Sequence, residues 1–241
     1  MIDYLKSTRH PFTSLLFVVP LLAFYEVMVV VLSGGVSGSN ELRNGADAWV
    51  RSQLVANDVS FAWALPVVVL AGLVILTVWK WSERPARPFT AVFGTFVESA
   101  VFAAALWALS RNFLPLLDRV GLPTQDVSFQ PVATGQVVRF VGAGIYEEVL
   151  FRLGLYGLLV LVMRLAFMPK FVAVPVAAVL GALAFSAAHH LGPAGEPITV
   201  PVFLFRAAAG VIFTALFAGR GLGVAVGSHA GYNILVGVSV G

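Results

Sequence analysis

The sequence contains no cysteine. This absence excludes disulfide bonds, thiolate nucleophiles, cysteine-ligated zinc and S-acylation. Charged residues are also scarce: they make up 11% of the chain, whereas about 25% is usual in a soluble domain. The net charge of +3 comes from scattered lysines and arginines rather than from a basic cluster among aromatic residues, so it does not indicate a nucleic-acid-binding protein. The sequence shows no internal repeat and no domain linker.

Hydrophobic residues make up 59% of the chain and give it a mean hydropathy of +0.91. This composition is typical of an integral membrane protein. Runs of about 17–25 apolar residues are long enough to cross a bilayer as helices. We therefore predict an all-α polytopic membrane bundle of about seven transmembrane helices, with six to eight possible, in one domain over residues 1–241. The predicted spans are about 12–32, 60–79, 89–109, 136–167, 171–191, 200–219 and 222–240.

The segments between and within these runs carry further signals. Residues 40–56 have the pattern of an amphipathic helix that lies in the membrane interface. The run 136–167 is longer than a bilayer requires, so we expect a tilt, a break near Gly154 or Gly157, or an extension outside the membrane. Residues 110–135 form the longest predicted connection, with four helix breakers: Pro115, Gly121, Pro123 and Pro131.

One apolar stretch contains three ionisable residues: Glu147, Glu148 and Arg152 lie among hydrophobic neighbours. An ionised group in hydrocarbon costs several kcal/mol, so such residues need partners and commonly have a function. Glu148 and Arg152 are four residues apart and share one face of a helix, where they can neutralise each other. Glu147 points about 100° away from that face. The spacing therefore predicts one carboxylate that is paired and one that is free to act.

Two other predicted spans have polar residues at helical spacing. Phe185 and His189 are four residues apart near the end of one span. His229 and Asn233 have the same spacing in the last span, so they face the same way. Ionisable side chains in membranes normally face the interior of the bundle. Glu147, His189 and His229 can therefore meet at one site, although a lone intramembrane histidine is commonly just a hydrogen-bonding tie between helices.

This ordered set of motifs resembles the CPBP family, which comprises type II CAAX prenyl endopeptidases, bacteriocin-processing and immunity-associated (Abi-like) membrane proteins, and related bacterial processing proteases. Three pairings form the pattern: Glu147-Glu148 with Arg152, Phe185 with His189, and His229 with Asn233. They fall within residues 136–236, the predicted catalytic core. Residues 1–135 contribute N-terminal helices and loops without a family motif.

The resemblance implies hydrolysis of a peptide bond inside the membrane. Glu147 would activate a water molecule, since a carboxylate held away from bulk water suits the work of a general base. His229 and Asn233 would donate hydrogen bonds to the developing oxyanion, each donor being worth about 3 kcal/mol. His189 would position the water or the carboxylate. The supporting residues would be Glu148, Arg152 and Phe185.

Alternative functions use the same residues. Glu147, His189 and His229 form a set of two histidines and one carboxylate that could hold zinc with an open position. No HExxH helix is present, and we favour the mechanism without a metal or other cofactor. A proton-coupled transporter is a second class, against which the absence of repeated halves speaks. A non-catalytic immunity or scaffold protein is the third.

The basic residues predict an orientation by the positive-inside rule. Eight lie on the side of the N-terminus and four on the other, which favours a cytoplasmic N-terminus: Lys6, Arg9, Lys80, Arg84, Arg87, Arg164, Lys170 and Arg220 against Arg43, Arg51, Arg111 and Arg119. Glu147 and His189 then fall in the outer half of the membrane, whereas the helical rise places His229 about 10–14 Å from the inner surface. Tilted or recessed helices must bring the three to one depth. We expect a cavity that opens to the non-cytoplasmic side and laterally to lipid.

The expected location is the bacterial inner (plasma) membrane, and the expected partners are a membrane protein or peptide substrate and the lipid bilayer, without nucleic acid. The sequence does not distinguish leader processing from C-terminal processing, and it does not indicate an oligomeric state. Glu26, Glu98 and Arg206 lie in predicted spans without an assigned role, and Arg139 is a candidate ion-pair partner of Glu98. His190 is expected to be a bystander at the membrane surface.

Overall fold

The structure, a computed structural model, describes residues 2–35, 42–59, 61, 63–119, 121, 134–191 and 195–238. These residues form helices and connecting turns, and no strand occurs among them. In chain order the elements are α1 (Ile2–Arg9), α2 (Pro11–Ser33), α3 (Gly45–Ala56), α4 (Ala64–Trp79), the 3₁₀-helix η1 (Trp81–Glu83), α5 (Pro88–Arg119), α6 (Thr134–Glu148), the π-helix η2 (Val149–Tyr156), α7 (Gly157–Leu165), α8 (Lys170–Ala188), α9 (Val200–Arg220) and α10 (Leu222–Val238).

This architecture confirms the all-α polytopic bundle predicted from the sequence. Among the described residues, four helices are long and apolar enough to cross a membrane: α2, α8, α9 and the Pro88–Phe113 part of α5. The helices α4 and α10 are apolar but shorter. The elements α6, η2 and α7 follow one another without a gap and cover the predicted span 136–167. Large apolar side chains on the outer faces of α4 and α5, such as Ile75 and Phe93, are exposed, as lipid-facing residues are expected to be.

The predicted connection 110–135 is wrong over its first part, because α5 continues to Arg119 with Pro115 inside it. A proline removes one backbone hydrogen bond. Here that loss falls close to the end of the helix, where the leucines after Pro115 still favour helix. Gly121 has a positive φ of 75°, a conformation that glycine adopts without strain. The other two predicted breakers, Pro123 and Pro131, lie outside the described residues.

The chain stays helical at Gly154 and Gly157, so the predicted break is not found; a change to π-helix, η2, occurs there instead. This element begins directly after Glu148 and ends where Gly157 starts α7. Segments of π-helix are rare and occur mostly at functional sites. The helix predicted in residues 40–56 is present as α3, and Asn44 is its N-terminal cap.

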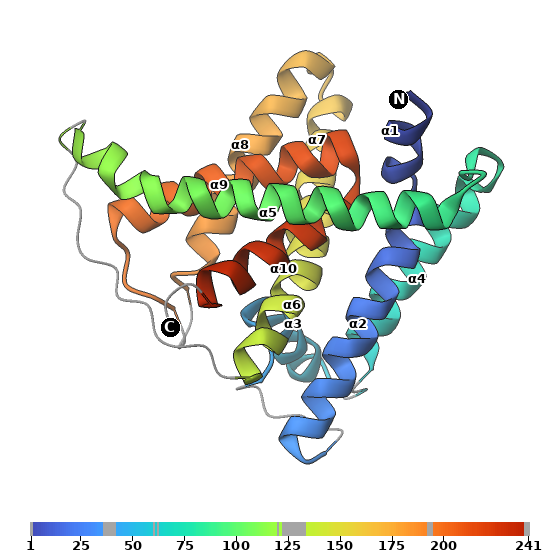
Figure 1. Cartoon of the computed structure of the whole chain (residues 1–241), viewed down its shortest axis with the longest axis horizontal. Coiled ribbons are helices and arrows are strands. Elements are labelled where there is room, and N and C mark those ends of the chain that lie inside the picture. Colours follow the sequence, from blue (N-terminus) through green and yellow to red (C-terminus); the bar gives the residue numbers. More distant parts are fainter. Residues whose placement is uncertain are drawn as a thin grey trace.

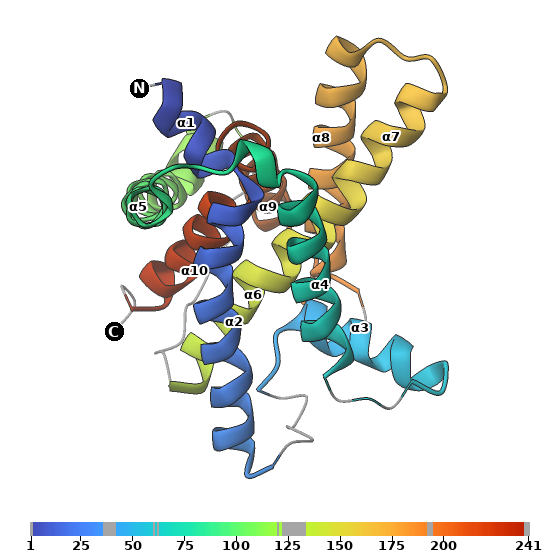
Figure 2. The same cartoon turned by 90° about the vertical axis from the view of Figure 1, so that its right-hand side faces the viewer.

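The short helix α10 lies between α5 on one side and α6 on the other, and it also contacts α9 and α2 (Figure 1, Figure 2). The close approach of α6 and α10 depends on Gly144. A Cβ atom at this position would lie 2.8 Å from the Cβ of Ala230 and 2.8 Å from the carbonyl oxygen of Val226. Small residues allow membrane helices to pack this closely. As a result, Glu147, one turn after Gly144, lies next to His229.

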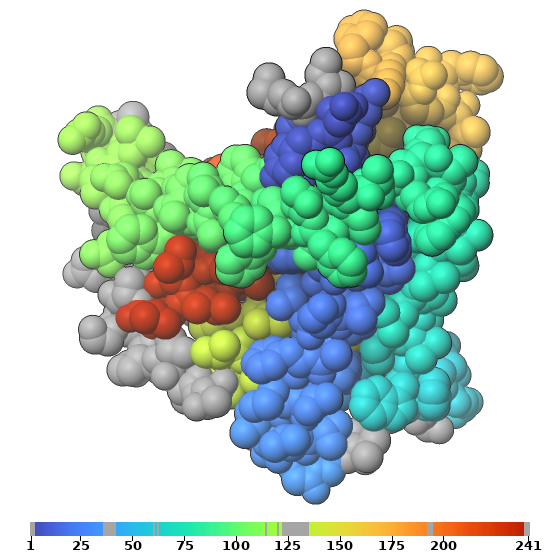
Figure 3. All heavy atoms as spheres, turned by 45° about the vertical axis from the view of Figure 1, so that its right-hand side comes forward, coloured from blue at the N-terminus to red at the C-terminus, as the bar shows by residue number. Residues whose placement is uncertain are grey.

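Two apolar cores hold the helices around this contact. One joins α2, α4, α6 and α10, and the other joins α5, α9 and α10. The helix α5 lies across α2 on the surface, with the end of α10 visible below it (Figure 3).

An ion pair ties α5 to the end of α9, but it is not the predicted one. Glu98 accepts a hydrogen bond from Nε of Arg220 at 2.7 Å, whereas Arg139 is exposed. A second nitrogen of Arg220 donates to the hydroxyl of Thr8 at 2.8 Å, which attaches α1 to the same point. Spacing along a helix cannot reveal a pair between residues so far apart in sequence.

Candidate active site

Glu147 lies in the last turn of α6, within the fully buried run 141–148. Its two carboxylate oxygens have different surroundings. Oε1 accepts a hydrogen bond from the side-chain amide of Asn44 at 3.3 Å. Oε2 is buried without a hydrogen-bond partner, and it lies 3.7 Å from Nε2 of His189 and 3.7 Å from Nε2 of His229.

The structure therefore brings together the three residues that the sequence predicts at one site. They come from α6, from the residue that follows α8 and from the middle of α10. His189 caps the C-terminus of α8 rather than lying inside the helix, and its Nδ1 is 2.8 Å from the carbonyl oxygen of Phe185. A separation of 3.7 Å is longer than a direct hydrogen bond, and polar groups at this distance are commonly bridged by water.

Glu148 forms the ion pair with Arg152 that the spacing predicts, at 3.1 Å between Oε1 and Nη1. The same oxygen is 2.7 Å from Nδ1 of His229, so Glu148 also holds that imidazole. A carboxylate at Nδ1 fixes the ring orientation and turns Nε2 towards Glu147. Glu148 has no exposed surface and Arg152 is 2% exposed. If one of the two charges were removed, water could not solvate the other.

Two phenylalanines pack around these charges. The guanidinium of Arg152 lies 4.4 Å from the ring centroid of Phe185 and 5.4 Å from that of Phe213. Such contacts are favourable for a desolvated cation. Phe213 also stacks on the His229 ring at 4.5 Å. Phe185 was singled out by its spacing to His189, whereas Phe213 has no such signal in an apolar helix.

Asn233 lies one turn beyond His229 on α10 and is partly exposed. Within the part of the chain that the structure describes, its side chain makes no hydrogen bond, to Glu147 or to any other residue. Its role at an oxyanion stays a prediction. His190 and Arg206, by contrast, form a separate group: Arg206 pairs with Glu196 at 2.7 Å, and Nδ1 of His190 is 2.8 Å from the Glu196 carbonyl oxygen.

A buried polar network next to Glu147 is absent from the sequence-based prediction. Arg43 pairs with Asp47 at 2.6 Å and with Glu26 at 3.3 Å, and all three are at most 5% exposed. Burial lowers the pKa of Arg43, but Asp47 and Glu26 raise it above its ordinary value, so the guanidinium stays charged. The one signal for this network is Glu26, a carboxylate inside an apolar run. Residues 42–47 form a polar segment of ordinary composition.

Zinc would suit the donor atoms of the site in kind, because histidine nitrogens and carboxylate oxygens are its usual ligands. Both histidines also bind an acceptor through Nδ1 and turn Nε2 to the site, as metal-bound histidines do. The spacing does not fit. Ligands of a tetrahedral zinc lie about 3.3–3.4 Å apart, and no group of three His, Asp or Glu side chains among the described residues is placed to hold an ion.

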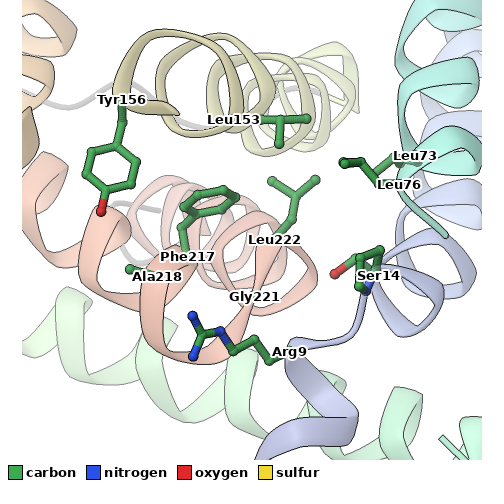
Figure 4. Close-up of a pocket in the computed structure, with 11 residues that line it drawn as sticks. Arg9, Ser14, Leu73, Leu76, Leu153, Tyr156, Phe217, Ala218, Gly221 and Leu222 are labelled. Atoms are coloured by element: carbon green, nitrogen blue, oxygen red, sulfur yellow. The ribbon is translucent and has the colours of Figure 1, made fainter. Parts of the chain in front are cut away.

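A cavity of about 300 Å³ lies elsewhere, between α2, α4, η2 and the turn from α9 to α10 (Figure 4). Arg9 and Tyr156 lie at its polar edge, and its walls are mostly leucines and Phe217. None of the residues that contact Glu147 lines it. The candidate active site is therefore defined by the convergent polar side chains and not by this cavity.

The comparisons with known proteins agree with the motif pattern. A family model described as "Type II CAAX prenyl endopeptidase Rce1-like" matches residues 130–235. No curated protein and no solved structure matches the chain. The matched segment includes Glu147, His189 and His229 but begins well after Asn44 and the buried network on α2 and α3.

Proposed function

Since a model of the Rce1-like type II CAAX prenyl endopeptidase family matches residues 130–235, we propose that the protein is an intramembrane endopeptidase in which Glu147 activates the attacking water. The family match supports a membrane endopeptidase, and the long apolar helices support an integral membrane protein. The substrate would be a membrane-associated protein or peptide, processed near its C-terminus or at a leader. One observation carries the mechanism: the buried, unpartnered Oε2 of Glu147 faces two histidines at 3.7 Å.

The reaction that this arrangement supports begins with a water molecule between Oε2 and the two imidazoles. Glu147 takes one proton as the water oxygen bonds to the scissile carbonyl carbon. Glu147, Glu148 and Arg152 together have one negative charge, so a protonated His229 makes the buried group neutral. Glu148 supports that cation through Nδ1, and the proton on Nε2 can stabilise the oxyanion. The carbon–nitrogen bond then breaks, and the proton on Glu147 passes to the leaving amine.

The experiment that tests this function uses purified protein in nanodiscs. One probe is an internally quenched farnesylated CAAX peptide, and a panel of membrane-anchored leader and C-terminal peptides is assayed in parallel, with products mapped by mass spectrometry. Cleavage at a defined bond that disappears in Glu147→Ala supports the proposal. Proton-coupled uptake into vesicles without any cleavage would favour a transporter instead, and inactivity in both assays would favour the non-catalytic alternative.

Activity is expected to survive a strong chelator, because the proposed reaction uses side chains alone. Dialysis against the chelator followed by the peptide assay should give an unchanged rate, and elemental analysis should find no stoichiometric zinc. One zinc per chain, lost together with activity and restored on addition of the metal, would contradict the mechanism and favour Glu147, His189 and His229 as ligands.

We expect the site to open on the non-cytoplasmic side of the bacterial inner membrane, with the N-terminus in the cytoplasm. Glu196 lies on the loop that follows His189 and its side chain is 57% exposed. In a chain without native cysteine, Glu196→Cys should react with an impermeant thiol reagent from outside. The control Lys6→Cys, on exposed Lys6 of α1, should react only after the cytoplasmic side is opened. The reverse pattern would contradict the orientation.

A further inference from the structure

We propose that Asn44 positions Glu147 by holding Oε1, so that Oε2 is the oxygen that acts. The catalytic role of Oε2 rests on the proposed function, whereas the contact between the two side chains does not depend on it. Asn44 lies outside the segment matched by the family model and is 3% exposed.

The orientation of the Asn44 amide follows from its place in the chain. Asn44 caps the N-terminus of α3, and its Oδ1 accepts a hydrogen bond from the backbone N–H of Asp47 at 3.1 Å. A cap requires an oxygen at this position, since the first N–H groups of a helix can only donate. The amide nitrogen must then point the other way, where it donates to Oε1 of Glu147 at 3.3 Å. The cap therefore decides which end of the amide meets the carboxylate.

The buried network fixes the start of α3 against α2 and α6. The backbone N–H of Asn44 donates to the Tyr25 hydroxyl at 3.2 Å, and that hydroxyl donates to Asp47 at 2.7 Å. Arg43, the residue before Asn44, is paired with both Asp47 and Glu26. The hydroxyl of Tyr146, the residue before Glu147, donates to Glu26. The network thus links Arg43, which precedes Asn44, to Tyr146, which precedes Glu147, through the carboxylate of Glu26.

The buried charges of Arg43, Asp47 and Glu26 hold Asn44 in position next to Glu147. A buried ion pair is weak evidence for stability, because desolvation cancels much of the attraction between the charges. Here the paired charges hold a neutral donor in place, and a neutral donor satisfies one oxygen without neutralising the carboxylate. Glu147 also faces the two histidines, and the adjacent Glu148 is paired with Arg152. Asn44 is the contact that distinguishes Oε1 from Oε2.

The test separates capping from donation. Asn44→Ser keeps a capping oxygen but has no group that reaches Glu147, and Asn44→Asp keeps the cap and the shape but replaces the donor by an oxygen. The matched control is Asn57→Ser at the other end of α3, where exposed Asn57 donates to the carbonyl of Gln53. Thermal unfolding in nanodiscs shows that each variant retains its fold.

The first readout is the carboxylate stretching band of Glu147 in the infrared spectrum, identified as the band that disappears in Glu147→Gln. We expect this band to shift in both Asn44 variants and to stay in place in Asn57→Ser. The second readout is the rate with the farnesylated CAAX peptide or the first membrane peptide found to be cleaved. The kcat of the Asn44 variants should fall by about tenfold to a hundredfold, with the KM within about twofold, as expected for a displaced reacting group.

The outcomes distinguish the two proposals. An unshifted band in both folded Asn44 variants overturns the positioning role, whatever the activity. A shifted band with an unchanged kcat shows the contact but removes its role in the reaction. If Glu147→Gln itself cleaves at the wild-type rate, the proposed function fails while the infrared result still reports on the contact. If Asn44→Asp does not fold, Asn44→Ser decides the question with the same two measurements.

Discussion

Replacement of Glu147 by glutamine is expected to lower the rate of peptide-bond hydrolysis by at least about a hundredfold, the usual contribution of a general base. Glutamine has the same shape, and its carbonyl oxygen can still accept the hydrogen bond from Asn44. It cannot take a proton from water at the position of Oε2. The measurement is kcat with the cleaved peptide in nanodiscs, combined with thermal unfolding to show that the variant remains folded.

The control for this prediction is Glu83→Gln, which removes a carboxylate whose side chain is 69% exposed on η1. It should retain the wild-type rate. The opposite result for the adjacent pair is equally informative. If Glu148→Gln is well folded and inactive while Glu147→Gln keeps full activity, then the roles of the two carboxylates are reversed.

Removal of either partner of the Glu148–Arg152 pair is expected to lower the folded yield strongly. Each substitution, Glu148→Gln or Arg152→Ala, leaves the other charge buried without a full partner, which typically costs about 3–5 kcal/mol. Arg152→Ala also removes the contacts of the guanidinium with Phe185 and Phe213. The fraction of monodisperse protein after solubilisation and the midpoint of thermal unfolding measure the effect.

A double variant shows whether this cost comes from charge. Glu148→Gln combined with Arg152→Met removes both charges and keeps similar volumes, so it should be more stable than the sum of the two single changes predicts. Additive losses would mean that the pair contributes no coupling and that shape alone accounts for the effect. Activity of the double variant should stay low, because His229 loses its carboxylate partner at Nδ1.

The sequence predicts the helices well because long apolar runs have few other solutions in a membrane. The runs at 12–32, 171–191 and 200–219 match α2, α8 and α9 closely. Pro115 misled the prediction, since a proline close to the end of a helix costs one hydrogen bond but does not end the helix. The convergence of Glu147, His189 and His229 at one site also follows from their spacing and from the family resemblance.

Other parts of the site could not be predicted, for physical reasons. The helical rise along straight helices places His229 and Glu147 at different depths in the membrane. In the structure the close contact between α6 and α10 at Gly144 brings the two side chains together. The contact between Asn44 and Glu147 joins residues 103 positions apart, and no periodic pattern reports such a pair. Phe213 looks like any other phenylalanine of an apolar helix until its stacking on His229 is seen.

The hydroxyl contact between Tyr146 and Glu26 has a consequence for how this protein can be divided. The family match begins at residue 130, yet the second half of the chain satisfies its buried groups with side chains from the first. A chimera that took its first 119 residues from another protein would need matching partners for Tyr146 and Glu147, or it would bury unpaired polar atoms. The two halves can therefore be exchanged only together with the side chains that meet across this contact, and a change on one side calls for a matching change on the other.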